Sequence, residues 1–180
     1  MIINKIQRWW QRRGFGIESK TDYAFLHDVL REQLPYYAYG EWQRQYPSAT
    51  KGEHNLARLL FRISNHLQPG TVRIYGSTTE LIRRAIHGGC RKATVTTSDT
   101  RYFKLANNCI AAKAETGTIV EYTPHKCGTD VTMAIVMTDI DAGNAALWQQ
   151  ILDLPAITYD LRHTGIALIH KKRYPEHYKI

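Results

Sequence analysis

The residues with the clearest chemical potential stand where an apolar strand meets a helix. The stretch Thr71–Leu81 reads Thr-Val-Arg-Ile-Tyr-Gly-Ser-Thr-Thr-Glu-Leu, so an apolar run ends at Gly76 and a helical pattern begins directly after it. A second apolar run, Ala93–Thr97, ends near Asp99, 23 residues after Gly76. This spacing is typical of a βαβ unit that holds a nucleotide-like cofactor on a glycine turn and its ribose on a later carboxylate. We therefore predict that the cofactor-binding residues are Tyr75, Gly76, Ser77, Thr78 and Asp99.

Two acidic residues of this unit also have a purely structural interpretation. Ser77-Thr-Thr-Glu80 has the pattern of a capping box, in which Ser77 and Glu80 bind backbone amides at the start of the helix. Such a cap occupies the helix-terminal amides and places negative charge where a cofactor carboxylate would approach. Asp99 either binds ribose hydroxyls or caps the helix expected after it, and the sequence favours neither role. No residue is singled out as catalytic.

Two further aspartates, Asp139 and Asp141, raise the question of a metal site. They are two residues apart at the end of an expected strand, so their side chains would share one face. A third acidic ligand is not evident, and Asp141 is also well placed to cap the next helix. His125 and Cys127 lack a second ligand pair at zinc spacing. We therefore predict no metal ion.

Hydrophobic periodicity sets the elements that must position these residues. The expected helices are Ile2–Arg13, a segment from Thr21 or Asp22 to before Pro35, Gly52–Gln68, Thr78–His87, Arg101–Ala114 and Ala142–Leu152. The expected strands are Thr71–Tyr75, Ala93–Thr97, Thr118–Tyr122, Thr132–Ile140, Ala156–Leu161 and Ile166–His170. Between them, Pro35–Pro47 is expected to be a loop. Its residues Tyr36, Tyr37 and Tyr39 line the cleft or pack the N-terminal part onto the sheet, and packing is favoured.

Strands that alternate with helices predict an α/β fold with a mainly parallel sheet and helices on both faces. The turn Arg162-His-Thr-Gly165 predicts a closing antiparallel hairpin over residues 156–170. The strand Thr71–Tyr75 is expected near the centre of the sheet. We expect residues 1–51 to form a helical lead that packs on a domain spanning residues 52–180, as one structural unit.

Several segments resemble the class I S-adenosylmethionine-dependent methyltransferases, in particular a group of bacterial methyltransferase-like proteins with an N-terminal helical lead. The shared segments are Arg13-Gly-Phe-Gly-Ile-Glu-Ser19, Leu59-Leu-Phe-Arg62, Thr71–Ser77, Tyr159-Asp-Leu161, Gly165-Ile-Ala-Leu168 and Glu176-His-Tyr178. The resemblance implies a Rossmann-like methyltransferase fold whose last two strands form a hairpin. It also implies that S-adenosylmethionine lies over the carboxyl ends of the first strands.

The chain departs from that family at the cofactor motif. Ile74 stands where the family has an acid two residues before the first glycine, and Glu80 stands where it has a further glycine. A strand–helix element is also expected to be missing before Thr132. We therefore interpret the chain as a short, degenerate member that binds the cofactor weakly or not at all and has a binding or regulatory role. The alternatives are an active small-molecule methyltransferase and a basic nucleic-acid-binding module.

Composition limits the remaining classes. The 180 residues suit one domain, and no apolar run approaches the length of a membrane span. Three cysteines without regular spacing favour reduced thiols and a cytoplasmic location. The net charge of +8 raises nucleic acid as a partner, but basic residues crowd both ends of the chain, so we expect a solvated surface. The partner is unknown, either a small molecule or a protein.

Overall fold

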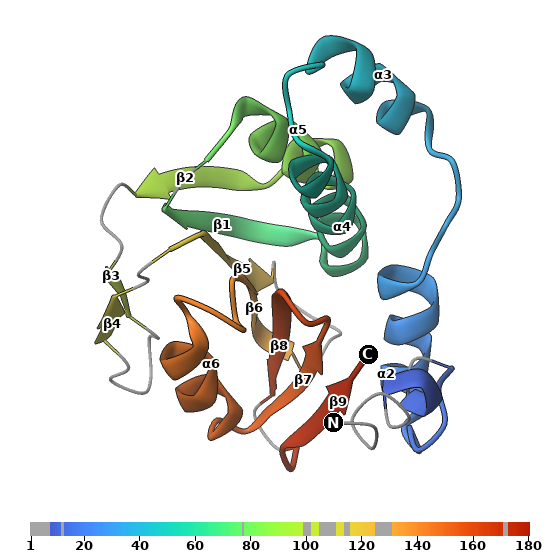
Figure 1. The fold of residues 1–180 in the computed structure, drawn as a ribbon, viewed down its shortest axis with the longest axis vertical. Helices are drawn as coiled ribbons and strands as arrows, with labels where there is room; N and C mark the ends of the chain where they lie inside the picture. Colours follow the sequence, from blue (N-terminus) through green and yellow to red (C-terminus); the bar gives the residue numbers. More distant parts are fainter. Residues whose placement is uncertain are drawn as a thin grey trace.

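The computed structural model describes residues 8–11, 13–76, 78–98, 102–104, 111–113, 116–124, 131–170 and 173–180 (Figure 1). The helical elements are α2 (Lys20–Phe25), the π-helical turn η1 (Leu26–Leu30), α3 (Tyr37–Gln45), α4 (Lys51–Leu67), α5 (Glu80–Gly89) and α6 (Ala145–Leu152). The strands are β1 (Pro69–Gly76), β2 (Thr94–Ser98), β3 (Tyr102–Lys104), β4 (Ala111–Lys113), β5 (Thr118–Pro124), β6 (Val131–Thr138), β7 (Ala156–Asp160), β8 (Thr164–His170) and β9 (Glu176–Lys179).

Seven of the described strands form one mixed sheet in the order β2-β1-β5-β6-β8-β7-β9. Only the pairs β1–β2 and β7–β9 are parallel, and the other four pairs are antiparallel. The α/β class and the hairpin over residues 156–170 are confirmed, but the expectation of a mainly parallel sheet is wrong. β5 follows the β3–β4 pair and runs back beside β1 without a described crossover helix, which a parallel pair would need. β1 is also second from the edge rather than central.

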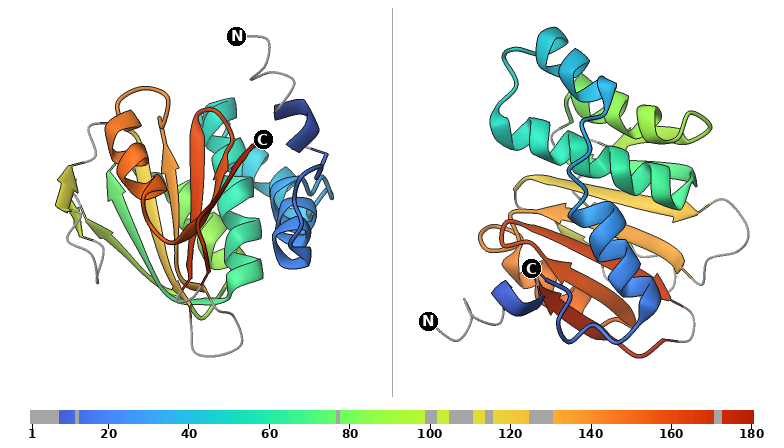
Figure 2. Two further views of the ribbon diagram at one scale, coloured as in Figure 1. Left: turned by 90° about the horizontal axis from the view of Figure 1, so that it is seen from below. Right: turned by 90° about the vertical axis from the view of Figure 1, so that its right-hand side faces the viewer.

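Helices cover both faces of this sheet (Figure 2). On one face, α2, η1, α4 and α5 pack on a core that includes Val72, Ile74 and Tyr122. On the other face, α6 packs through Trp148 on a core that includes Tyr75. Neighbouring residues of one strand divide between the two cores because side chains alternate across a strand. Both faces are therefore apolar, which explains the continuous apolar runs of the central strands.

The sequence predicted α4 and α5 to within about three residues. α4 begins with a complete capping box, in which Thr50 and Glu53 each bind the other's backbone amide. α5 is capped by Thr79, whose hydroxyl accepts from the amide of Ile82. The proposed cap at Ser77 is therefore wrong, because the helix begins three residues later; Ser77 itself lies outside the described residues.

Two expectations between the main helices and strands are wrong. Pro35–Pro47 is not a loop, because it contains α3, whose Tyr39 and Trp42 are buried. Tyr36 and Tyr39 pack on Phe61 of α4 rather than on the sheet. The expected helix Arg101–Ala114 is replaced, where it is described, by the antiparallel pair β3–β4. Among the described residues, no helix lies between β2 and β6.

The N-terminal segment is joined to the last strands of the sheet. Asp22, which is 3% exposed, accepts two hydrogen bonds of 2.7 Å from the guanidinium of Arg173. The hydroxyl of Tyr159 on β7 donates to the carbonyl of Asp22. Arg8 binds Asp160 at the carboxyl end of β7 at 2.9 Å. These contacts fix the lead against β7 and β9, and β9 itself was not foreseen. No helix of the described residues could cross a membrane.

Candidate functional site

A cleft of about 630 Å³ lies at the sheet edge where β1 and β6 end and β5 and β8 begin. These ends meet because β5 and β8 run opposite to β1 and β6, so that Gly76 pairs with Thr118 and Thr138 pairs with Thr164. The first turns of α4 and α5 form the opposite wall. The edge therefore gathers three threonines of the sheet, Thr118, Thr138 and Thr164, with Thr79 of α5.

Contacts within the chain allow only glycine at position 76. It adopts a φ of +89°, which is costly for residues with a side chain. A Cβ atom built on Gly76 would clash with the carbonyl oxygen of Gly117, directly before β5. Gly117 has a φ of +71°, and a Cβ there would meet the side chains of Thr138 and Asp139. The space that a glycine turn would leave for a cofactor is thus taken by the antiparallel neighbour of β1.

The residues beside Gly76 point in different directions. Tyr75 is buried on the α6 face, where its hydroxyl donates to the buried carboxylate of Glu121 at 3.2 Å. Burial, and then Glu121, raise the pKa of Tyr75. Ile74 is fully buried in the opposite core, which also holds Leu59 and Ile82 of the cleft wall, but Ile74 itself does not line the cleft. Tyr75 therefore does not belong to the cleft.

The other predicted binding residues are divided by the structure. Thr78 directly precedes the α5 cap, and its hydroxyl is buried without a hydrogen-bond partner among the described residues. It remains the nearest of the predicted residues to Thr79, which lines the cleft. Ser77 and Asp99 lie outside the described residues. Of the predicted residues that the structure describes, none lines the cleft: Gly76 pairs with Thr118 and Thr78 directly precedes Thr79, which both line it, and Tyr75 lies on the other face.

A histidine–aspartate pair stands at this cleft. His163, in the β7–β8 turn, lines the cleft, and its Nδ1 lies 2.7 Å from the carboxylate of Asp141. This hydrogen bond lowers the pKa of Asp141. With Nδ1 engaged by the carboxylate, Nε2 is the nitrogen that is free to accept a proton from a ligand. The pair is thus a candidate proton acceptor at the cleft.

Asp139 and Asp141 have roles other than the expected ones. The carbonyl of Asp139 accepts hydrogen bonds from the amides of Ala142 and Asn144 and so closes the turn before α6. α6 begins after Asn144 rather than after a cap at Asp141. Among the described residues there is no group of three or more His, Cys, Asp or Glu side chains that could hold a metal ion.

Sequence reasoning missed the wall of the cleft that α4 supplies. Glu53 lines it with the backbone amide of Thr50 bound to its carboxylate, which lowers the pKa of Glu53. Arg62 also lines it and donates to the carbonyl of Val29 at 2.6 Å. The pairing of His163 with Asp141 had no signal in the sequence either, because it joins two turns on different sides of α6.

Comparison of this chain with protein-family models, with curated proteins and with solved structures finds no match. The class that the structure defines is therefore an α/β protein with a mixed seven-stranded sheet, helices on both faces and a polar cleft at one sheet edge.

Proposed function

We propose that this chain is a methyltransferase-like protein that has a binding or regulatory role and does not use S-adenosylmethionine. Its ligand is a small polar molecule held in the cleft at the sheet edge. One observation carries the proposal: the glycine turn after β1 is filled by Gly117 of the chain itself. The first turn of α5 adds to this, because Thr79 already accepts from one of its amides and Glu80 adds a negative charge.

The features that favour the methyltransferase-like origin lie on either side of this turn. The parallel unit β1–α5–β2 and the hairpin β7–β8 agree with what the sequence resemblance implies, although β9 follows the hairpin instead of the chain ending on it. The antiparallel β5 beside β1 is the main departure. We infer that the departure removed the cofactor position while a cleft of ligand size remained at the edge.

Calorimetry with S-adenosylmethionine and S-adenosylhomocysteine tests the cofactor part of the proposal. We expect a dissociation constant weaker than about 1 mM, which corresponds to less than about 4 kcal/mol of binding free energy. A micromolar dissociation constant for either compound would contradict the proposal and restore a cofactor-using enzyme.

The binding part is tested by ¹⁵N NMR with a panel of nucleosides, amino acids and hydroxy acids. We expect at least one class to shift the amide signals of Thr79, Thr118 and Thr164, which surround the cleft. The variant Leu56→Trp narrows the cleft from α4 and should abolish these shifts. If no compound moves these signals, the cleft is not a ligand site.

An active small-molecule methyltransferase is the second candidate, because His163 and Asp141 form a proton acceptor at the cleft. Removal of a proton from an acceptor group is a step in which such a pair assists. This candidate would be favoured if the protein transfers labelled methyl groups from S-adenosylmethionine and the variant His163→Asn does not. Unchanged transfer in His163→Asn would exclude the pair from the reaction.

A further inference from the structure

The middle of the chain carries a large excess of positive charge. Residues 36–98 contain nine Lys or Arg residues and three Asp or Glu residues. Residues 99–180 contain nine of each, and residues 1–35 contain six basic and four acidic residues. Basic residues do crowd both ends, with five against one acid in residues 1–20 and four against one acid in residues 171–180, but the expectation of a neutral middle is wrong. Eight of the nine central basic residues lie on α3, α4 and α5 or directly after α5.

These three helices form one layer, so their charges belong to one part of the molecule. Tyr39 and Trp42 of α3, Ala57 of α4 and Leu81 of α5 share a buried cluster. Arg84 of α5 reaches the hydroxyl of Tyr46 directly after α3. The views in Figures 1 and 2 place this layer at the end of the molecule away from β9.

Two of the three acids in this layer are already engaged. The carboxylate of Glu53 binds the backbone amide and hydroxyl of Thr50, and the carboxylate of Glu41 binds the amide of Gln45. The exposed basic residues on and after the helices include Arg44, Arg84 and Arg91. The surface therefore attracts anions and offers few carboxylates to compensate them.

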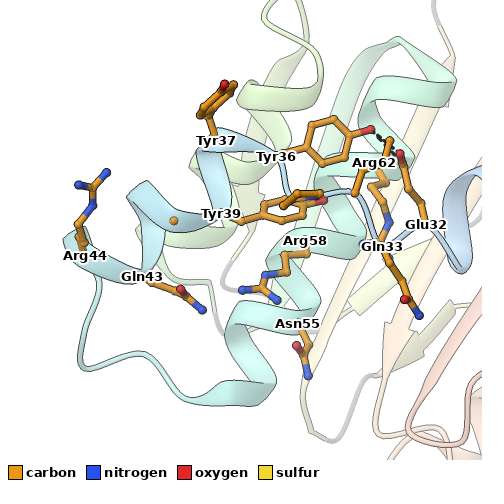
Figure 3. Close-up of a pocket in the computed structure, with 13 residues that line it drawn as sticks. Glu32, Gln33, Tyr36, Tyr37, Tyr39, Gln43, Arg44, Asn55, Arg58 and Arg62 are labelled. Atoms are coloured by element: carbon orange, nitrogen blue, oxygen red, sulfur yellow. Dashed lines mark hydrogen bonds between the residues drawn. The ribbon is translucent and has the colours of Figure 1, made fainter.

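A cleft of about 720 Å³ opens between α3 and α4 within this layer (Figure 3). Its polar lining is rich in hydrogen-bond donors, because Arg58 of α4 faces the side-chain amides of Gln43 and Asn55. The guanidinium of Arg58 lies 5.1 Å from the centre of the Tyr39 ring, which fixes its position. No described carboxylate pairs with Arg58. The cleft contains one acid, Glu32, which accepts a hydrogen bond from the hydroxyl of Tyr36.

An aromatic ring stands free beside this donor set. Tyr37 opens α3, lines the same cleft and has its side chain fully exposed at 101% of the reference area. In Figure 3 its ring projects away from the protein and from Arg58, whereas Tyr36 and Tyr39 pack edge-on against Phe61 of α4. An exposed aromatic beside cationic donors is the arrangement that binds single-stranded nucleic acid, with a base on the ring and phosphates on the cations.

We propose that the α3–α4–α5 layer binds single-stranded nucleic acid, with the backbone in the cleft at Arg58 and a base stacked on Tyr37. The free ring favours a strand with unpaired bases over an acidic protein or an anionic membrane, which need no stacking surface. This role goes beyond binding of a small molecule at the sheet edge, since it uses Arg58 and α3, although the two clefts are adjacent and share Asn55 and Arg62 of α4.

Fluorescence anisotropy with a labelled 15-residue single-stranded oligonucleotide tests the proposal. If about four phosphates are neutralised, raising the salt from about 50 to 200 mM should weaken binding by roughly 50-fold. Arg58→Gln should lower the affinity and flatten this salt dependence. Tyr37→Ala should weaken binding by about 5-fold or more at every salt concentration, and Tyr37→Phe should restore it.

Two control variants each remove one positive charge, as Arg58→Gln does, but outside the α3–α4–α5 layer. Lys20→Gln and Lys179→Gln each lose an exposed lysine outside the layer, and both should bind as the unchanged protein does. Equal losses in these controls and in Arg58→Gln would overturn the proposed site. So would tighter binding to a duplex, binding to a mononucleotide as tight as to the oligonucleotide, or binding only to vesicles of anionic lipid.

Discussion

Gly76 and Gly117 both require glycine, Gly76 because the carbonyl oxygen of Gly117 lies against it and Gly117 because Thr138 and Asp139 lie against it. Both adopt the left-handed backbone region, and each leaves space that a neighbouring residue occupies. A sequence pattern that marks Gly76 as a cofactor turn therefore has a second explanation in packing alone. The two explanations differ in what they demand of the neighbours, since only packing requires Gly117 to lie beside Gly76.

Gly76→Ala should lower the free energy of unfolding by about 2 kcal/mol or more, because it combines an unfavourable φ with a close approach. Gly16→Ala is the matched control: Gly16 has a φ of +80° but nothing within 4 Å of its Cβ position. It should cost about 1 kcal/mol from backbone strain alone. Urea denaturation measures both values. Equal losses would mean that the contact with Gly117 contributes nothing.

At the scale of elements, the sequence predicted where most helices and strands lie along the chain, but it did not predict the directions of the strands in the sheet. α4, α5 and the strands β1, β5 and β8 lie where periodicity placed them, because their apolar faces are long and regular. β9 and α3 were missed, because β9 is short with one buried residue and α3 is rich in Tyr and follows a proline. An apolar strand has the same pattern whichever way it runs, so only the pairing of the whole sheet set the antiparallel course of β5.

The candidate site was predictable only in part, for the same reason. Gly76 and Thr78 were singled out because they are local to one strand–helix junction, and they lie next to Thr118 and Thr79 of the cleft without lining it. His163, Asp141 and Arg58 were not found, because each gains its surroundings from residues distant in sequence.

The contact between α2 and the segment before β9 gives a prediction at the same scale. Asp22→Ala should destabilise the protein by about 2–3 kcal/mol, because it leaves Arg173 without its carboxylate in a largely buried site. The value is below that of a fully buried pair, since the Arg173 side chain is 26% exposed. A double-mutant cycle with Arg173→Ala measures the coupling. Additive losses from the two substitutions would show that the pair is not coupled.

Across the whole molecule, charge is unevenly distributed, and the N-terminal lead is attached to the last strands of the sheet. The helical layer α3–α4–α5 carries an excess of positive charge, whereas residues 99–180, which supply five of the seven strands of the main sheet, have equal numbers of basic and acidic residues. The N-terminal lead runs along the α4 face and joins the last strands through Asp22 and Arg8. The sheet therefore depends on segments from both ends of the chain. We expect the whole chain to unfold as one cooperative unit.

Removal of residues 1–34 tests this dependence. The lead buries Phe25, Leu26 and Val29, each at most 3% exposed, against the core beside α4. Each such side chain contributes about 1.5–3 kcal/mol, so their loss approaches the whole stability of a domain of this size. The truncation also exposes Tyr159, whose ring centre lies 5.2 Å from that of Phe25.

We expect the truncated protein to aggregate and to lose its cooperative thermal transition, as followed by circular dichroism and size-exclusion chromatography. A monomer with an unaltered Tm after loss of residues 1–34 would instead identify the lead as an independent arm.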